Sequence, residues 1–138
     1  MKIAILGAGR VGSSLARNLS NNNYEVSIVD ESKSKIDLLQ EKLDIGCVVG
    51  HAAHKDSLLK LGVDEDTIVI AVTSNDEVNI IACQIAKKQF NAKKTICRFR
   101  DTAYIDDLDI FGEGIIDMPI SPEYEVTSHL RELIAHPG

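Results

Sequence analysis

The sequence predicts an α/β protein in which a doubly wound, parallel sheet of six strands lies between two layers of helices. Short apolar runs alternate with helical repeats along the whole chain, and this alternation favours parallel strands joined by right-handed crossovers. A second observation is a glycine-rich turn over residues 7–12, between the first predicted strand and the first predicted helix. We therefore expect a single domain over residues 1–138, built in three αβα layers.

The predicted strands are short runs rich in β-branched and apolar residues, which suit a buried pleated surface. The run at 67–72 is the most apolar of them, so we expect it to be deeply packed. Turn-forming residues, such as the three asparagines at 21–23, separate helices from the strands that follow them. In chain order, the six strands are expected at residues 2–6, 24–29, 45–49, 67–72, 95–99 and 114–117.

The predicted helices are recognised by apolar residues three or four positions apart. Three of them carry clear stripes. These stripes are Val11, Leu15 and Leu19 in the first helix, Ile36, Leu39 and Leu43 in the second, and Val78, Ile81, Ala82, Ile85 and Ala86 in the clearest one. Weaker patterns indicate short helices at 57–61 and 104–108, and a last amphipathic helix follows Pro122.

The composition indicates a soluble, cytosolic protein. With 44% hydrophobic residues, the 138-residue chain can bury a core, and no segment reaches the ~18 apolar residues of a spanning helix. We therefore expect no direct insertion into a membrane. The net charge of −6 would repel a nucleic-acid backbone, so nucleic acid is not an expected partner. Three cysteines without a Cys-x-x-Cys pair favour a reducing compartment.

The turn after the first strand has the spacing of a dinucleotide fingerprint, and its strand–turn–helix context is the one that this motif requires. Its six residues are Gly7, Ala8, Gly9, Arg10, Val11 and Gly12. Gly7 permits the tight turn, Gly9 lets the backbone approach a pyrophosphate, and Gly12 lets helix and strand pack closely. Unpaired N–H groups at the helix start favour an anion. The turn therefore predicts a Rossmann-like domain that binds an adenine dinucleotide.

An acidic residue completes this fingerprint at the end of the second strand. Asp30 lies 18 residues beyond Gly12, where a carboxylate can accept hydrogen bonds from both hydroxyls of the adenosine ribose. It would repel the 2′-phosphate of NADP, so NAD(H) is the expected cofactor. The exclusion of NADP is not absolute, because three residues that could offset this repulsion lie nearby: Ser32, Lys33 and Lys35.

Five segments carry a resemblance to a known family. They are MKIAILGAGRVG at 1–12, GHAAH at 50–54, AVTSNDE at 71–77, CQIA at 83–86 and CRFR at 97–100. Through them essentially the whole chain resembles the RCK or TrkA-N family, the regulatory NAD-binding domains of potassium transport proteins, and in particular the first such domain of proteobacterial members. Many members have Gly-Asp where this chain has Gly50-His51, whereas the proteobacterial members resemble this chain in having Gly-His.

The resemblance implies a regulator and not an enzyme. Such a cytosolic domain lies at the inner face of the cell membrane and passes a nucleotide-linked conformational state to a membrane-embedded potassium-translocating subunit. The resemblance also implies that the chain is a fragment of a longer protein, with a homodimer formed through the last helix and a larger ring in the full-length protein. Packing of that helix on its own sheet is the alternative.

Two other functions stay open at this point. ATP or ADP can replace NAD(H), because related potassium-channel regulators bind adenine nucleotides in the same cleft and the Asp30 contact needs only the adenosine ribose. The chain can also be the cofactor-binding half of an NAD-dependent oxidoreductase. That reading lacks support, because no acid–base constellation follows the sixth predicted strand.

Residues outside the glycine fingerprint are also expected at the cofactor. Residues 73–75 follow the fourth strand, at the sheet edge where ligands bind in open parallel sheets, although Asn75 can equally cap a helix. Arg10 can bind a phosphate, including one held by a neighbouring subunit, or remain a solvated side chain. Arg98 suits phosphate or subunit contact, or an ion pair. The expected set beyond the fingerprint glycines is thus Arg10, Asp30, His51, Thr73, Ser74, Asn75 and Arg98.

No metal site is expected. His51 and His54 are three residues apart, with Cys47 and Asp56 nearby. Structural zinc, however, needs four ligands at recognisable spacing, which this group does not show.

Overall fold

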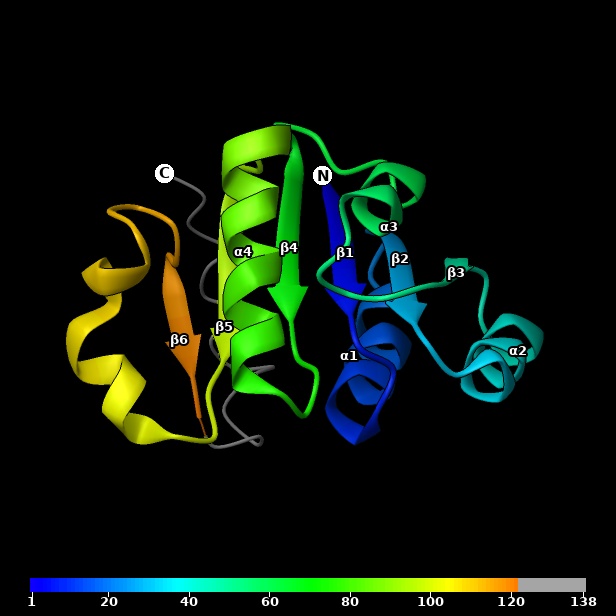
Figure 1. Ribbon diagram of the computed structural model, residues 1–138. Coiled ribbons are helices and arrows are strands. Elements are labelled where there is room, and N and C mark those ends of the chain that lie inside the picture. The colour runs from blue at the N-terminus through cyan, green and yellow to red at the C-terminus, as the bar shows by residue number, and fades with distance from the viewer. Residues whose placement is uncertain (122–138) are drawn as a thin grey trace.

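The computed structural model describes residues 1–121, which form one six-stranded parallel sheet with helices on both faces (Figure 1). The strand order is β3-β2-β1-β4-β5-β6, and every neighbouring pair is parallel. This is the doubly wound, Rossmann-like arrangement that the sequence predicts. The strands are β1 (Lys2–Leu6), β2 (Glu25–Asp30), β3 (Gly46–Val49), β4 (Thr67–Ala71), β5 (Lys94–Arg98) and β6 (Met118–Ile120).

The helices connect successive strands, and three of them start at side-chain caps, including η1, where Asp101 accepts the N–H of Ala103. Ser32 accepts a hydrogen bond from the N–H of Lys35, and Asn75 accepts one from the N–H of Val78. Such caps satisfy donors that a helix start leaves unpaired. The helices are α1 (Arg10–Ser20), α2 (Lys33–Lys42), α3 (Lys55–Lys60), α4 (Asp76–Phe90) and the 3₁₀ segment η1 (Thr102–Phe111).

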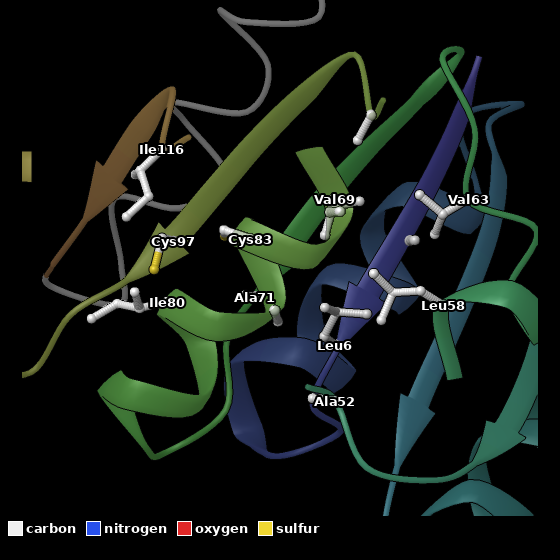
Figure 2. Close-up of a cluster of buried hydrophobic side chains, with 14 of the residues drawn as sticks. Leu6, Ala52, Leu58, Val63, Val69, Ala71, Ile80, Cys83, Cys97 and Ile116 are labelled. Atoms are coloured by element: carbon white, nitrogen blue, oxygen red, sulfur yellow. The ribbon is translucent and has the colours of Figure 1, made fainter. Parts of the chain in front are cut away.

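Two hydrophobic clusters cover the two faces of the sheet. Alternate residues of β1 point to opposite faces, so Ile3 and Ile5 pack with α1 and α2. Leu6 packs on the other face with α3 and α4 (Figure 2). The predicted stripe of α1 lies in the first cluster, and β4 is buried along its whole length. These clusters establish the three αβα layers.

Two of the three cysteines, Cys83 of α4 and Cys97 of β5, lie inside the second cluster (Figure 2). The Cys83 thiol and burial raise the pKa of Cys97 well above its ordinary value. The Cys97 thiol therefore stays protonated. Both buried cysteines behave as small apolar side chains, as their apolar sequence context predicts.

The prediction of the sixth strand was wrong in position. The expected segment 114–117 is a turn, and the chain joins the sheet only at Met118, which pairs with Ile96. Gly112 and Gly114 have φ values of +117° and +73°, and Ile115 is held in the turn by the hydroxyl of Thr95. The apolar residues Ile115 and Ile116 therefore gave the sequence of this turn the pattern of a strand. The true strand contains Pro119, which a sheet tolerates at its edge.

The buried face of α4 also differs from the predicted stripe. Ala82 and Ala86 are buried as expected, but Ile81 is 45% exposed, whereas Ile80 lies inside. The reason is Asn79, which is completely buried and forms hydrogen bonds with the loop before α4 and with β5. These bonds fix the rotation of the helix. Hydrophobic spacing alone does not choose between adjacent isoleucines.

The weak helix expected at 104–108 is the longer segment η1, with a non-helical residue at Asp107. The amphipathic helix expected after Pro122 lies outside the described residues. Within residues 1–121, no helix is both long and apolar enough to cross a membrane.

Candidate functional site

A cleft opens at the carboxyl end of the sheet, between β1 and β4. From these two central strands the chain proceeds outward in opposite directions, with α1 after β1 on one face and α4 after β4 on the other. Ligands of open α/β sheets bind at this type of switch point. The cleft has a volume of about 430 Å³, which lies within the usual range for small-molecule and cofactor sites.

The three fingerprint glycines meet different surroundings. Gly7 has a φ of +112°, and a Cβ on Gly12 would lie 1.8 Å from the carbonyl oxygen of Gly7, so that position has no room for a side chain. Gly9 differs, because a Cβ there would have no protein atom within 4 Å. The fold therefore requires Gly12, whereas nothing in the described protein itself crowds Gly9.

Helix α1 begins at this turn with its N-terminus at the cleft. Gly9 is its N-cap residue, and no side chain caps its first turn. The first N–H groups of a helix lack partners within the helix and carry partial positive charge. Because Gly9 lines the cleft, the turn presents backbone donors to an anion.

Asp30 links the end of β2 to the glycine turn. One carboxylate oxygen accepts the N–H of Ala8 at 2.8 Å, and the other accepts the N–H of Ser32 at 2.8 Å. The side chain is half-buried and lines the cleft. A carboxylate offers roughly four acceptor positions, so two remain after these bonds. The carboxylate is thus held in one orientation by backbone donors, with no cation neutralising it among the described ion pairs.

The far wall of the cleft is built around Asn79, which the sequence analysis missed. Its side-chain oxygen accepts hydrogen bonds from the Thr73 N–H at 3.0 Å and hydroxyl at 2.6 Å. Its amide nitrogen donates to the carbonyl oxygens of Thr73 and Arg98. A polar amide among the apolar residues of α4 was the available signal. This residue joins the ends of β4 and β5.

The expected site residues of this wall surround the same space. Arg98 is half-buried, and its guanidinium donates to the Thr73 carbonyl at 3.5 Å. Asn75 is the N-cap of α4, so its side-chain oxygen is occupied by a backbone donor. Ser74 and Arg10 are exposed at the cleft. The capping role expected as an alternative for Asn75 is therefore confirmed.

Two histidines stack close to the end of β2, near Asp30. The rings of His51 and His54 have centroids 4.3 Å apart and planes 20° apart. His51 Nδ1 accepts the N–H of Ala53 at 3.0 Å, so the ring carries its proton on Nε2 in the neutral form. His51 lines the cleft. Among residues 1–121, no group of three or more His, Cys, Asp or Glu is arranged to hold a metal ion.

The structure brings together most of the expected site residues but not all. Ala8, Val11 and Gly12 lie beneath the turn, in the buried layer, and not in the lining. Seven lining residues were not expected there: Val29, Glu31, Lys35, Gly50, Ala52, Val72 and Val78. The expected residues that line the cleft are Gly7, Gly9, Arg10, Asp30, His51, Thr73, Ser74, Asn75 and Arg98.

Comparison with known proteins identifies relatives over the whole chain. The TrkA-N domain model matches residues 3–122. The Trk system potassium uptake protein TrkA of Halomonas elongata is 43% identical over 140 residues, and that of Vibrio alginolyticus is 42% identical over 141 residues. Both matches cover 100% of this chain and 31% of the relative. The chain thus spans about a third of the length of these relatives.

Solved structures share the fold at lower identity. The TrkA-N domain of the inner membrane protein ybaL from Escherichia coli is 20% identical, with a TM-score of 0.77 and 96% of each chain covered. The Kef CTD of Shewanella denitrificans in AMP-bound form is 23% identical, with a TM-score of 0.71, covering 100% of this chain and 82% of that chain. The GsuK channel bound to NAD is 18% identical, with a TM-score of 0.69, covering 87% of this chain and 21% of that chain.

The family match extends over almost all of the chain, and the curated relatives are more than 40% identical along its full length. The glycine turn, Asp30 and the switch-point cleft lie inside the matched residues. The chain therefore belongs to the TrkA-N domain family.

Proposed function

We propose that this domain binds NAD(H) in the switch-point cleft. The pyrophosphate occupies the space above Gly9, where the N-terminus of α1 supplies N–H donors. The adenosine ribose donates its hydroxyls to the open positions of the Asp30 carboxylate, and the adenine lies toward His51. The rest of the dinucleotide extends toward Thr73, Ser74 and Arg98, which line the opposite wall.

The observation that carries this proposal is the way in which Asp30 is held. Two backbone N–H groups orient its carboxylate at 2.8 Å each, and its remaining acceptor positions lie at a cleft. Preorganised acceptors lose little freedom when a ligand binds. The open space at Gly9, where the fold itself does not demand a glycine, is a second and independent support.

The cleft also favours NAD(H) over NADP. Asp30 and Glu31 both line it and would repel a 2′-phosphate. Of the nearby lysines, Lys33 is engaged with Asp37 at 2.8 Å. Lys35 lines the cleft and is the basic residue placed to offset these carboxylates.

We further propose that the domain is a regulator of potassium uptake and not an enzyme. The supporting observation is its membership of the TrkA-N family, with relatives named as Trk potassium uptake proteins. In this role the domain works in the cytosol and acts on a membrane-embedded potassium-translocating subunit. Regulation requires that a nucleotide bind two conformational states of the domain with different affinity. The proposed homodimer through the last helix would transmit that difference.

A second candidate ligand is a mononucleotide, namely ATP, ADP or AMP. The Asp30 contact needs only an adenosine ribose, and the structural neighbour from Shewanella denitrificans in AMP-bound form supports this candidate. The α1 N-terminus would hold a terminal phosphate as readily as a pyrophosphate.

Calorimetric titration of the chain with NADH, NAD⁺, ATP, ADP and NADP at one ionic strength tests the proposal. We expect NADH or NAD⁺ to bind at least about tenfold more tightly than NADP, a difference of about 1.4 kcal/mol. Preference for ATP or ADP would instead indicate that the domain senses the ratio of adenine nucleotides and not the redox state of NAD(H). The absorbance of the nicotinamide ring can be monitored in mixtures of the chain, NADH and candidate hydroxy acids or ketones. Sustained turnover there would overturn the proposal that the domain is a regulator and not an enzyme.

A further inference from the structure

A second groove lies between α1 and α2, next to the cleft, with which it shares Gly9, Arg10 and Lys35. Its volume is about 380 Å³, and four of its nine lining residues are basic while none is acidic. Leu38 contributes an apolar surface that is 54% exposed. The four basic residues are Arg10, Arg17, Lys35 and Lys42. The groove is therefore positive around an apolar patch, on a chain whose net charge is −6.

The cations of this groove are not neutralised within the described part of the chain. Other lysines are: Lys33 pairs with Asp37, Lys60 with Asp56 and Lys87 with Asp117. None of the four groove cations forms an ion pair among residues 1–121. All four are exposed. Arg10 and Lys35 also line the nucleotide cleft, whereas Arg17 and Lys42 line the groove alone. A partner that brings carboxylates would gain from the unopposed charge of Arg17 and Lys42.

The complementary surface lies on η1. Residues 101–117 contain six acidic residues and no lysine or arginine. Asp106, Asp107 and Asp109 are exposed, and Ile110 beside them is 65% exposed, although Tyr104 and Leu108 pack on the core. This segment therefore presents an apolar side chain among carboxylates, the reverse of the groove.

One copy of the chain cannot join the two surfaces. The groove belongs to the helices after β1 and β2, and η1 connects β5 with β6 at the opposite edge of the sheet (Figure 1). Five steps of about 4.8 Å separate the edge strands, which amounts to about 24 Å. The two surfaces also lie on opposite faces, since α1 and α2 cover one cluster and η1 packs on the other.

We propose that the groove between α1 and α2 binds the acidic η1 segment of a second copy of this chain. Ile110 of one copy then covers Leu38 of the next, and Asp106, Asp107 and Asp109 lie against the groove cations. The contact joins unlike surfaces, so each copy offers one groove and one segment. Repetition of such a head-to-tail contact produces a ring or a filament. The proposal does not depend on which nucleotide occupies the cleft, because Arg17 and Lys42, the cations changed in the test, line the groove and not the cleft.

Charge reversal and mixing test this contact. One variant carries Arg17→Glu and Lys42→Glu, and the other carries Asp106→Lys and Asp109→Lys. Each variant alone places like charges together, so we expect self-association at low salt to weaken at least about tenfold. A mixture of the two restores opposite charges at both possible contacts. Sedimentation velocity of wild type, of each variant and of the mixture, at low and high salt, measures the outcome.

The controls separate the contact from general effects of charge and folding. A variant with Lys55→Glu and Lys88→Glu has the same change of net charge outside the groove and should associate like wild type. Leu38→Asp should weaken association, whereas Leu59→Asp, at a leucine that is also exposed but lies on α3, should not. Circular dichroism verifies folding of each variant. Reassociation in the mixture supports the proposal.

Other outcomes would overturn it. Wild-type chains that show no salt-dependent association beyond the dimer proposed through the last helix lack the contact, and larger species that persist unchanged in all variants must use another surface. If the mixture fails to reassociate although both variants are folded, the two surfaces are not partners. If millimolar pyrophosphate binds the groove and charge reversal leaves association unchanged, the groove is an anion site and not an interface.

Discussion

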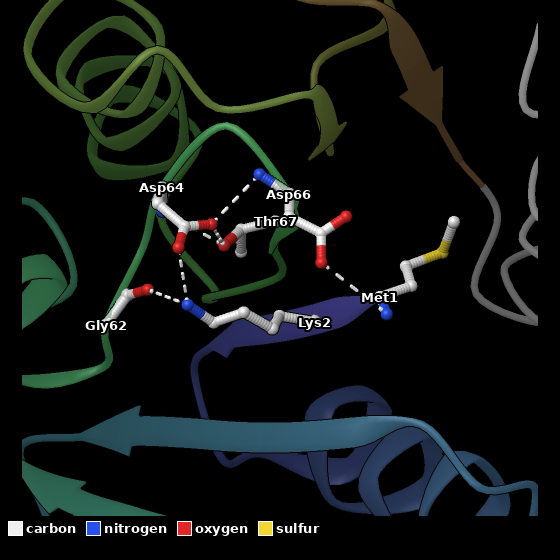
Figure 3. Close-up of polar contacts among 6 residues, drawn as sticks. All are labelled: Met1, Lys2, Gly62, Asp64, Asp66 and Thr67. Carbon is white, nitrogen blue, oxygen red and sulfur yellow. Dashed lines mark hydrogen bonds and ion pairs between the residues drawn. The ribbon is translucent and has the colours of Figure 1, made fainter.

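The two ends of the sheet both gather charged side chains, but they hold these charges in different ways. At the amino end, Lys2 donates to the carboxylate of Asp64 at 2.7 Å and to the carbonyl of Gly62 at 2.8 Å (Figure 3). The amino group of Met1 lies 3.5 Å from Asp66. Each of these four charges therefore meets an opposite charge of the same chain.

At the carboxyl end, the charges of the cleft are held by the backbone. Asp30 accepts two backbone N–H groups, and Arg98 donates to a backbone carbonyl. A backbone dipole orients a carboxylate without cancelling its charge. The four charges at the amino end thus neutralise one another in pairs, whereas Asp30 at the carboxyl end keeps an oriented charge at the cleft. The type of partner that a charged residue has, an opposite charge or a backbone group, is therefore a better indicator of function than the exposure of the residue.

The largest effect is expected from Gly12→Ala, which tests whether the carboxyl end also depends on tight packing. The new Cβ would lie 1.8 Å from the Gly7 carbonyl oxygen, so helix and turn must separate. We expect a loss of about 3 kcal/mol or more in the free energy of unfolding, measured by urea denaturation. The control Gly46→Ala, where the nearest atom would be 3.4 Å away, should be much milder. Equal stability of the two variants would contradict the packing role of Gly12.

Asp30→Ala is expected to have the largest effect on binding. Loss of hydrogen bonds from a charged acceptor is worth roughly 1.5 to 3 kcal/mol, or about 10- to 150-fold in nucleotide affinity. Titration calorimetry of the folded variant measures it. Glu31→Ala is the matched control, because it removes an exposed carboxylate from the same cleft. Unchanged affinity for NADH in folded Asp30→Ala would refute the ribose contact.

Gly9→Ala separates binding from folding at the same turn. The backbone angles of Gly9, φ −75° and ψ −161°, are accessible to alanine, and its Cβ would meet no protein atom. We expect the unfolding free energy to stay within about 0.5 kcal/mol, while affinity for NADH falls at least about tenfold, or 1.4 kcal/mol. Wild-type affinity in this variant would show that no phosphate approaches the turn.

The smallest effect is expected at the amino end, from Lys2→Met. The Lys2 hydrogen bond, and next that from the Asp66 backbone, lower the pKa of Asp64 below its usual value of 3.8. A lowered pKa stabilises the fold above that value, and the contribution is lost as the pH falls through the lowered pKa. The melting temperature of Lys2→Met should therefore lie slightly below that of wild type near neutral pH, and the gap should close in acid.

The affinity of Lys2→Met for NADH tests whether the amino end of the sheet has any part in nucleotide binding. The amino end is far from the cleft, so Lys2→Met should bind NADH with wild-type affinity. A drop in affinity comparable to that of Asp30→Ala would break the division of roles between the two ends of the sheet.

The sequence by itself determined the order of strands and helices, the parallel sheet and the glycine turn. These features rest on local patterns: apolar periodicity, glycine at fixed spacing, and an acidic residue at the end of a strand. Most residues that line the cleft were predictable for the same reason, since the ends of parallel strands meet at one edge of a sheet.

Only the tertiary structure decided which side of each element faces the interior, and which polar groups satisfy one another. The rotation of α4 depends on the hydrogen bonds of Asn79 with Thr73 and with β5, 19 residues away in sequence. The position of β6 depends on a glycine turn tied to Thr95. The backbone donors that orient Asp30 come from both the preceding turn and the following loop. Such contacts join residues distant in sequence, so a local pattern does not contain them.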